Sequence, residues 1–168
     1  MRTLIALVAA GLLTLAGCGT ETGSSASTGS DEVGSGAGEV YEFTGTTLDG
    51  ASFDGARLEG KPAVLWFWAP WCPTCRAQIP NVTVLAEKYD GEVAVVGVGG
   101  LDSEDAIRDL AADIPHLTHL VDDEGAVWSH FGVTAQSTYA VLGADGEIEA
   151  EGYLADQELN DLVAQLAG

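Results

Sequence analysis

Two continuous apolar runs, at residues 63–68 and 93–98, are the strongest feature of the hydrophobic pattern. Apolar runs of this length without alternation are typical of strands buried on both faces. Between the runs, apolar side chains recur at spacings of three and four, which predicts a helix with one buried face. The residues that carry this spacing are Ile79, Val82, Ala86 and Tyr89. The pattern therefore predicts a buried strand, an amphipathic helix and a second buried strand.

The rest of the chain continues this alternation. Ser103 can cap a further helix whose first turn is acidic and whose apolar stripe ends at Ile114. The Asp49-Gly50 pair predicts a β-hairpin near the start of the folded region. The remaining predicted elements are a strand at 118–121, a short helix at 126–130, strands at 139–142 and 147–152 around Asp145-Gly146, and a last helix from Asp156. These elements predict an α/β sheet covered by helices, with antiparallel hairpins at its margins.

The pattern of the N-terminal segment predicts a targeting signal rather than a part of this fold. A short positive start precedes thirteen mostly apolar residues, 4–16, which fit the core of a secretory signal and are too few to span a bilayer. Leu15-Ala16-Gly17-Cys18 resembles the bacterial lipobox, in which the cysteine is acylated. We therefore predict a lipoprotein signal peptide at 1–17 and lipid attachment at Cys18.

The segment that follows predicts a tether. Gly, Ser and Thr occupy 14 of the 20 positions from 19 to 38, and none is aromatic. Such a segment cannot bury enough apolar surface to offset its ordering entropy, and as a coil it reaches roughly 25 Å. We predict a lipidated cysteine and tether at 18–38 and a single domain at 39–168.

Charge and hydropathy limit the classes of function. The chain has 6 Lys+Arg and 26 Asp+Glu, a formal net charge of −20, which excludes a nucleic-acid binder because phosphates would be repelled. A hydrophobic content of 46% is too high for an acidic disordered chain. The acidic run 122–124 lacks the spacing of a calcium loop, and we interpret it as a solvated turn. No carboxylate occurs from residue 60 to residue 86.

That carboxylate-free stretch holds the candidate chemistry, Trp71-Cys72-Pro73-Thr74-Cys75. Two thiols three residues apart share a helix face, so their sulfurs can close a disulfide with little backbone movement. Cys72 lies at the predicted helix N-terminus, where N–H groups and the helix dipole can lower the pKa of a cysteine thiol from about 8.5 to roughly 3.5–7.5. We therefore expect Cys72 to attack and Cys75 to resolve the mixed disulfide. Pro73 at the first helical position costs no hydrogen bond.

Other uses of the two cysteines stay open at this point. A structural disulfide that closes so short a loop constrains little entropy. Zinc needs four ligands, which one Cys-x-x-Cys and three scattered histidines, His116, His119 and His130, supply badly. Copper is the stronger alternative, because thiolates bind Cu(I) well and one distant histidine could complete three ligands. We predict redox exchange with no resident metal or cofactor, and keep a copper-binding or copper-delivery lipoprotein as the alternative.

The motif and its surroundings resemble the thioredoxin superfamily. The residues that carry the resemblance are Gly60-Lys61-Pro62, Trp68-Ala69-Pro70-Trp71-Cys72-Pro73-Thr74-Cys75, Pro80 and Asp145-Gly146. The sequence is most similar to the TlpA/DsbE-like branch of extracytoplasmic thiol-disulfide oxidoreductases, which includes redoxin and AhpC/TSA-type domains. This resemblance covers nearly all of residues 40–168. It implies a thioredoxin fold, with helices on both faces of a mixed central sheet and an added N-terminal β-hairpin, a Cys72 nucleophile and a Cys75 resolver.

The sequence departs from that branch at two positions. Gln78 replaces the usual Glu three residues after the second cysteine, so it cannot ionise. Ser137 stands where the family presents a cis-proline opposite the cysteines. A cis bond costs about 2.5–4 kcal/mol before serine and about 0.5–1 kcal/mol before proline, so we expect a trans peptide here. The change at Ser137 weakens the case for general dithiol exchange and raises the copper alternative slightly.

Further side chains of the motif are expected to support the two sulfurs. Trp68 and Trp71 predict an apolar collar around Cys72 onto which a partner docks, with a purely core position as the alternative for Trp68. Pro73 and Thr74 shape the turn between the cysteines. With Gln78 and Ser137 they complete the candidate site.

Taken together, these features predict a membrane-anchored extracytoplasmic thiol-disulfide oxidoreductase. Its expected partners are exported proteins with thiols or disulfides and a membrane redox partner, and we expect a monomer. The direction of exchange depends on reduction potential and partner supply, which no motif reveals.

Overall fold

The computed structural model describes residues 38–168. The predicted signal peptide, Cys18 and the tether up to residue 37 lie outside the described residues. No helix within 38–168 combines the length and the apolar character that crossing a membrane requires.

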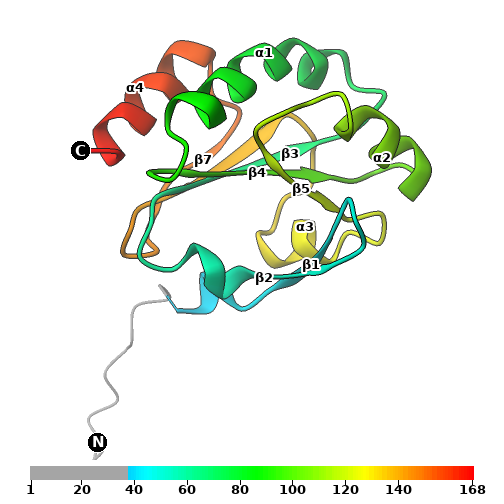
Figure 1. Cartoon of the computed structure of the whole chain (residues 1–168), viewed down its shortest axis with the longest axis horizontal. Coiled ribbons are helices and arrows are strands. Elements are labelled where there is room, and N and C mark those ends of the chain that lie inside the picture. Colours follow the sequence, from blue (N-terminus) through cyan, green and yellow to red (C-terminus); the bar gives the residue numbers. More distant parts are fainter. Residues whose placement is uncertain (1–37) are drawn as a thin grey trace, which may run out of the picture. The chain divides into compact units, whose positions relative to one another are not determined.

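The described part of the chain alternates strands and helices in the predicted order (Figure 1). Its strands are β1 (Thr44–Thr47), β2 (Ser52–Asp54), β3 (Ala63–Trp68), β4 (Ala94–Gly99), β5 (Thr118–Val121), β6 (Thr138–Leu142) and β7 (Ile148–Gly152). Its α-helices are α1 (Pro73–Lys88), α2 (Glu104–Ala111), α3 (Ala126–His130) and α4 (Asp156–Leu166). Two short 3-10 helices, η1 (Glu39–Tyr41) and η2 (Gly55–Leu58), lie on either side of the first hairpin.

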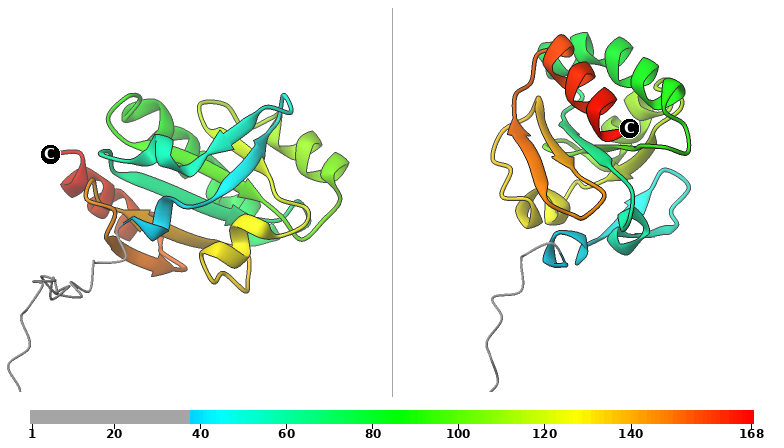
Figure 2. Two further views of the ribbon diagram at one scale, coloured as in Figure 1. Left: turned by 90° about the horizontal axis from the view of Figure 1, so that it is seen from below. Right: turned by 90° about the vertical axis from the view of Figure 1, so that its left-hand side faces the viewer.

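All seven strands form one mixed sheet in the order β2-β1-β5-β4-β3-β6-β7. The three central strands β5, β4 and β3 are parallel, and β6 pairs antiparallel with β3. The hairpins β1–β2 and β6–β7 form the two opposite margins of the sheet (Figure 2). The mixed sheet with marginal hairpins is therefore confirmed, including the added hairpin at the N-terminal side of the domain.

Helices cover both faces of this sheet. Helices α1, α2 and α4 pack on one face, while α3 packs on the other face with η1 and η2 (Figure 1). Strand β3 supplies both cores because successive side chains point to opposite faces. Trp66 and Trp68 enter the first core and Leu65 and Phe67 the second, and all four are fully buried. Because both faces of β3 are buried, its sequence is a continuous apolar run.

The acidic run 122–124 differs from its prediction as a solvated turn. Asp122 is only 6% exposed, and its carboxylate accepts from the backbone N–H groups of Val127 and Trp128 at 3.2 and 2.9 Å. It therefore satisfies the free N–H groups at the start of α3, a role that a carboxylate performs well at a helix N-terminus. The solvated-turn interpretation was wrong for Asp122, because the chain folds back onto the end of β5.

Candidate active site

The two cysteines lie where the buried strand β3 passes into helix α1. Cys72 has extended backbone angles and forms the N-cap of α1, which begins at Pro73 as predicted. The Cys72 Sγ atom accepts the backbone N–H of Cys75 at 3.1 Å. Together with the dipole of a 16-residue helix, this contact favours negative charge on Cys72 rather than on Cys75.

Cys72 and Cys75 form a disulfide, with their Cα atoms 5.3 Å apart. That separation lies inside the ordinary range for a bridged pair, so the Cys-x-x-Cys spacing closes the bond without displacing the backbone. The side chains are 2% and 1% exposed, respectively. The sulfurs are thus nearly shielded from water in the oxidised state.

Ser137 brings the loop before β6 against both sulfurs. Its Oγ atom lies 3.2 Å from the Cys72 Sγ and 3.1 Å from the Cys75 Sγ. Its backbone N–H donates to the Phe67 carbonyl at 2.9 Å, which ties this loop to β3. The peptide before Ser137 is trans, as expected, since residues 38–168 contain no cis peptide bond. The candidate site thus includes a hydroxyl from a residue more than sixty positions away in the chain.

Gln78 faces the interior of the domain behind the cysteine pair. It is 4% exposed, and its Oε1 atom accepts the indole N–H of Trp66 at 2.9 Å. The other amide atom, Nε2, has no hydrogen-bond partner among residues 38–168. Gln78 therefore holds Trp66 of β3 and has no hydrogen bond to either sulfur within the part of the chain that is described.

The predicted tryptophan collar is only half present. Trp71 is 53% exposed, and its indole N–H donates to the carbonyl of Leu101, which is itself 51% exposed. Trp68 is fully buried and stacks on Trp66 with ring centroids 5.6 Å apart. Trp68 is therefore not part of the collar and has the core position given as its alternative, because alternation along β3 turns its side chain into the interior. The apolar surface beside the cysteines is instead formed by Trp71 and Leu101.

The remaining motif residues stay close to the redox pair. Thr74 is exposed in the first turn of α1. Arg76 places its positive charge one turn from Cys72, with its Nε donating to the Pro70 carbonyl at 2.9 Å. This guanidinium lies on the side that the helix dipole already makes favourable for a thiolate.

The histidines named for metal binding do not join the cysteines. The His119 Nε2 atom lies 2.9 Å from the Ile114 carbonyl, and the His130 Nε2 lies 3.1 Å from the Val40 carbonyl. Burial lowers the pKa of His119, so its imidazole is held neutral. Across residues 38–168, no three His, Cys, Asp or Glu side chains are grouped so that they could hold a metal ion. Copper would find two sulfur ligands here and no histidine beside them.

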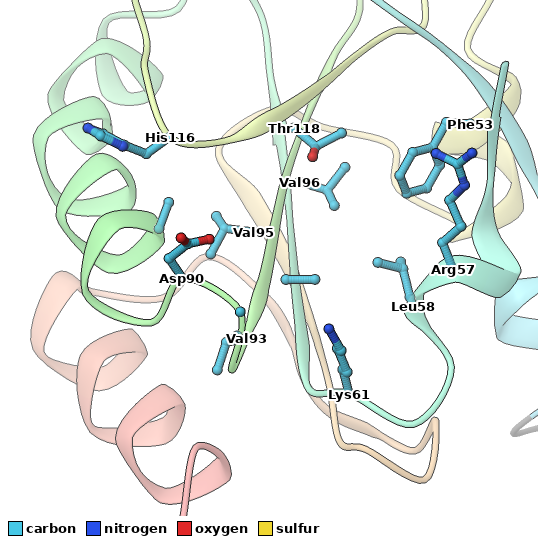
Figure 3. Close-up of a pocket in the computed structure, with 13 residues that line it drawn as sticks. Phe53, Arg57, Leu58, Lys61, Asp90, Val93, Val95, Val96, His116 and Thr118 are labelled. Carbon is cyan, nitrogen blue, oxygen red and sulfur yellow. The ribbon is translucent and has the colours of Figure 1, made fainter. Parts of the chain in front are cut away.

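A hollow of about 310 Å³ lies at the opposite end of the parallel strands, where β4 and β5 begin (Figure 3). Arg57 and Lys61 line it from one side, and Asp90 and His116 from the other. None of the predicted site residues lines it. Since Cys72 follows the end of β3, the hollow and the redox pair lie at opposite ends of the sheet.

Comparison with known proteins decides the family. The Redoxin family model matches residues 25–166. The chain belongs to the redoxin family.

Its relatives include the soluble secreted antigen MPT53 of Mycobacterium tuberculosis, 40% identical over 111 residues. That match covers 66% of this chain and 64% of MPT53, so it spans less than two thirds of the relative. The Pseudomonas aeruginosa thiol:disulfide interchange protein DsbE is 34% identical over 89 residues, which are 51% of this chain and 48% of DsbE.

Solved structures give the same assignment over more of their length. The structure of M. tuberculosis DsbF in its mixed oxidized and reduced forms has a TM-score of 0.71 and 43% identity, covering 76% of this chain and 97% of that one. A secreted M. tuberculosis disulfide oxidoreductase homologous to E. coli DsbE has a TM-score of 0.69 and 36% identity, covering 76% of this chain and 98% of that one. These comparisons confirm the predicted family and thioredoxin-like fold, and they support the predicted enzyme class.

Proposed function

We propose that this redoxin-family chain is a thiol-disulfide oxidoreductase that exchanges its Cys72–Cys75 pair with exported protein partners, while a lipid on Cys18 holds it at the extracytoplasmic face of the membrane. One observation carries the redox part of the proposal. The two cysteines form a disulfide in which the first sulfur is the N-cap of α1 and accepts the backbone N–H of the second. A thiolate is stabilised at Cys72 and has its disulfide partner within bonding reach.

The exchange proceeds in two steps that balance in sulfur and electrons. In the reducing direction, the Cys72 thiolate attacks one sulfur of a partner disulfide, and the other partner sulfur leaves as a thiolate. Cys75 then attacks the Cys72 Sγ, so the mixed disulfide breaks and the Cys72–Cys75 bond forms. Two electrons pass to the partner, which departs as a dithiol. The oxidising direction is the same sequence reversed.

Trp71 and Leu101 support docking of a protein partner beside the sulfurs. Both side chains are about half exposed, although each is large and apolar. The hydrogen bond between the Trp71 indole and the Leu101 carbonyl fixes them next to one another. A rigid aromatic side chain of this kind loses little entropy when a partner covers it.

The proposed location rests on the N-terminal sequence and on the relatives. Leu15-Ala16-Gly17-Cys18 ends a secretory signal on an acylatable cysteine. MPT53 is a soluble secreted antigen, and the solved M. tuberculosis oxidoreductase is secreted, so export is common to these relatives. Lipid attachment would add an anchor that keeps the domain at the membrane surface.

Substitution of each cysteine tests the redox proposal. The Cys75→Ser variant should accumulate a mixed disulfide with partner peptides, whereas Cys72→Ser should accumulate none. A chain whose two variants behave identically would contradict the assigned roles. Titration of the wild-type couple against glutathione then gives the direction, since a potential near −180 mV favours an oxidant and one near −270 mV favours a reductant, as rough guides.

Two further measurements test the anchor and the copper alternative. Full-length chain expressed in a lipoprotein-processing bacterium should fractionate with membranes, and Cys18→Ala should release it. Recovery of the variant in the membrane fraction would defeat the lipid anchor. Tight one-to-one Cu(I) binding without any disulfide exchange would replace the oxidoreductase by a copper-binding protein.

A further inference from the structure

Ser137 is the one polar side chain that touches the reacting atoms within residues 38–168. Its Oγ atom is within hydrogen-bond distance of both sulfurs, at 3.2 Å from Cys72 and 3.1 Å from Cys75. A hydroxyl can donate one proton and accept another at the same time. In the disulfide it can only donate, because neither sulfur carries a proton. After reduction it can accept from a Cys75 thiol and donate to a Cys72 thiolate.

Among residues 38–168, no other buried polar side chain has a hydrogen bond to either sulfur. Gln78 accepts from Trp66, His119 contacts the Ile114 carbonyl, and Asp122 caps α3. The carboxylate-free stretch from 60 to 86 offers no acid or base beside the sulfurs, and the nearby Arg76 holds the Pro70 carbonyl. Within residues 38–168, Ser137 is therefore the one side chain whose hydrogen-bonding group lies beside both sulfurs, where a proton must move during exchange.

We propose that Ser137 is a catalytic residue, whose hydroxyl stabilises the Cys72 thiolate and transfers the Cys75 proton during resolution of the mixed disulfide. This inference rests on the proposed oxidoreductase function. In the resolving step, the Cys75 thiol gives its proton to the Ser137 Oγ, while the Ser137 hydroxyl gives its own proton to the partner sulfur that leaves Cys72. The leaving sulfur is bonded directly to the Cys72 Sγ, which Ser137 already contacts.

The step is balanced in atoms and electrons. One S–S bond forms between Cys75 and Cys72, and one S–S bond breaks between Cys72 and the partner. The Cys75 sulfur is oxidised and the partner sulfur is reduced to a thiol. Ser137 ends the step as it began, with one proton received and one given.

Ser137 has an energetically unfavourable backbone conformation. Its φ angle is +66°, in the left-handed region that residues other than glycine rarely occupy. Such backbone conformations persist where the surrounding structure fixes them, and they cluster at functional sites. The Ser137 N–H bond to the Phe67 carbonyl fixes this one.

Two substitutions at position 137 separate the hydroxyl from the backbone. Both Ser137→Ala and Ser137→Gly remove the hydroxyl, but glycine relieves the positive φ and alanine does not. Effects shared by the two variants therefore belong to the hydroxyl. Thr138→Val is the matched control, because Thr138 is the next residue, the first of β6, and its hydroxyl donates to the Ala135 carbonyl instead of a sulfur.

Thiolate stability is measured by the pH dependence of Cys72 alkylation in the reduced full chain. A hydrogen bond to a charged group accounts for about one pH unit, so both Ser137 variants should move the midpoint upward by roughly that amount. Below the midpoint, alkylation should slow about tenfold. The reduced form is then destabilised, so the couple becomes more reducing by about 30 mV for the same tenfold change. Thr138→Val should leave all three readouts unchanged.

Proton transfer is measured by stopped-flow release of a peptide from its mixed disulfide with Cys72. Both Ser137 variants should slow release about tenfold below pH 7 and approach the wild-type rate at high pH, where Cys75 ionises without help. Unchanged release and alkylation in both variants would overturn the role of Ser137 while leaving the oxidoreductase intact. A wild-type chain that exchanges with no peptide would instead defeat the proposed function. Variants that diverge from one another would assign the effect to the backbone and overturn the proposal.

Discussion

Replacement of Leu101 by glycine should leave the free energy of unfolding almost unchanged, although the side chain is large and half buried. Leu101 has a φ angle of +58° and is 51% exposed. Removing a half-buried leucine costs about 1 kcal/mol, and glycine adds roughly 0.5–1 kcal/mol of backbone entropy. Glycine adopts the left-handed conformation without strain, which raises the free energy of unfolding by about 1–2 kcal/mol. These opposing contributions cancel to within about 1 kcal/mol.

Ile148 provides the matched control for this prediction. It is 49% exposed but lies in strand β7, with no positive φ angle to relieve. Ile148→Gly should therefore cost about 1.5–2 kcal/mol. Urea unfolding of the oxidised chain measures both variants under identical conditions. Equal losses in the two variants would refute the claim that Leu101 stores backbone strain beside the cysteines.

Three further expectations concern the framework of the site. Asp122→Ala should cost about 2–4 kcal/mol in urea unfolding, because the N–H groups of Val127 and Trp128 lose a charged acceptor, and Asp122→Asn should recover part of that loss. Because burial lowers the pKa of His119, stability is complete above the unfolded value near 6.5 and declines as pH falls below it; His119→Gln should flatten this dependence in urea midpoints between pH 8 and 5. Gly97→Ala should cost about 1–3 kcal/mol, since the new Cβ would lie 2.7 Å from the His119 Nδ1; a thermal midpoint equal to wild type would contradict this packing.

Local patterns predicted the strands and helices well because they report which faces of each element are buried. The apolar run of β3 became a central strand, and Pro73 became the first residue of α1. The same patterns placed Cys72 at a helix N-terminus, where its reactivity could be argued from backbone geometry. The choice between collar and core stayed open for Trp68 because a continuous apolar run does not say which neighbour each side chain will meet.

Individual contacts between distant segments depend on the register of the sheet, which local patterns in the sequence do not give. The hydroxyl of Ser137 meets Cys75 only because β6 pairs with β3 in a register that sets Thr138 opposite Phe67. Likewise, the Leu101 carbonyl meets Trp71 because β4 runs parallel to β3 and ends beside it. The family resemblance placed Ser137 opposite the cysteines, but only the structure shows that its hydroxyl lies within hydrogen-bond distance of both sulfurs.

The two departures from the family pattern, at Gln78 and Ser137, both place a neutral polar side chain near the cysteine pair. Gln78 stands where a carboxylate is usual, and its amide holds the Trp66 indole instead of serving as a base. Ser137 supplies a neutral hydroxyl against both sulfurs. A buried hydroxyl costs much less than a buried carboxylate, which would also repel the Cys72 thiolate. The thiolate is then the one negative charge that the site must accommodate, and the donors that stabilise it are neutral groups held by β3, α1 and the loop before β6.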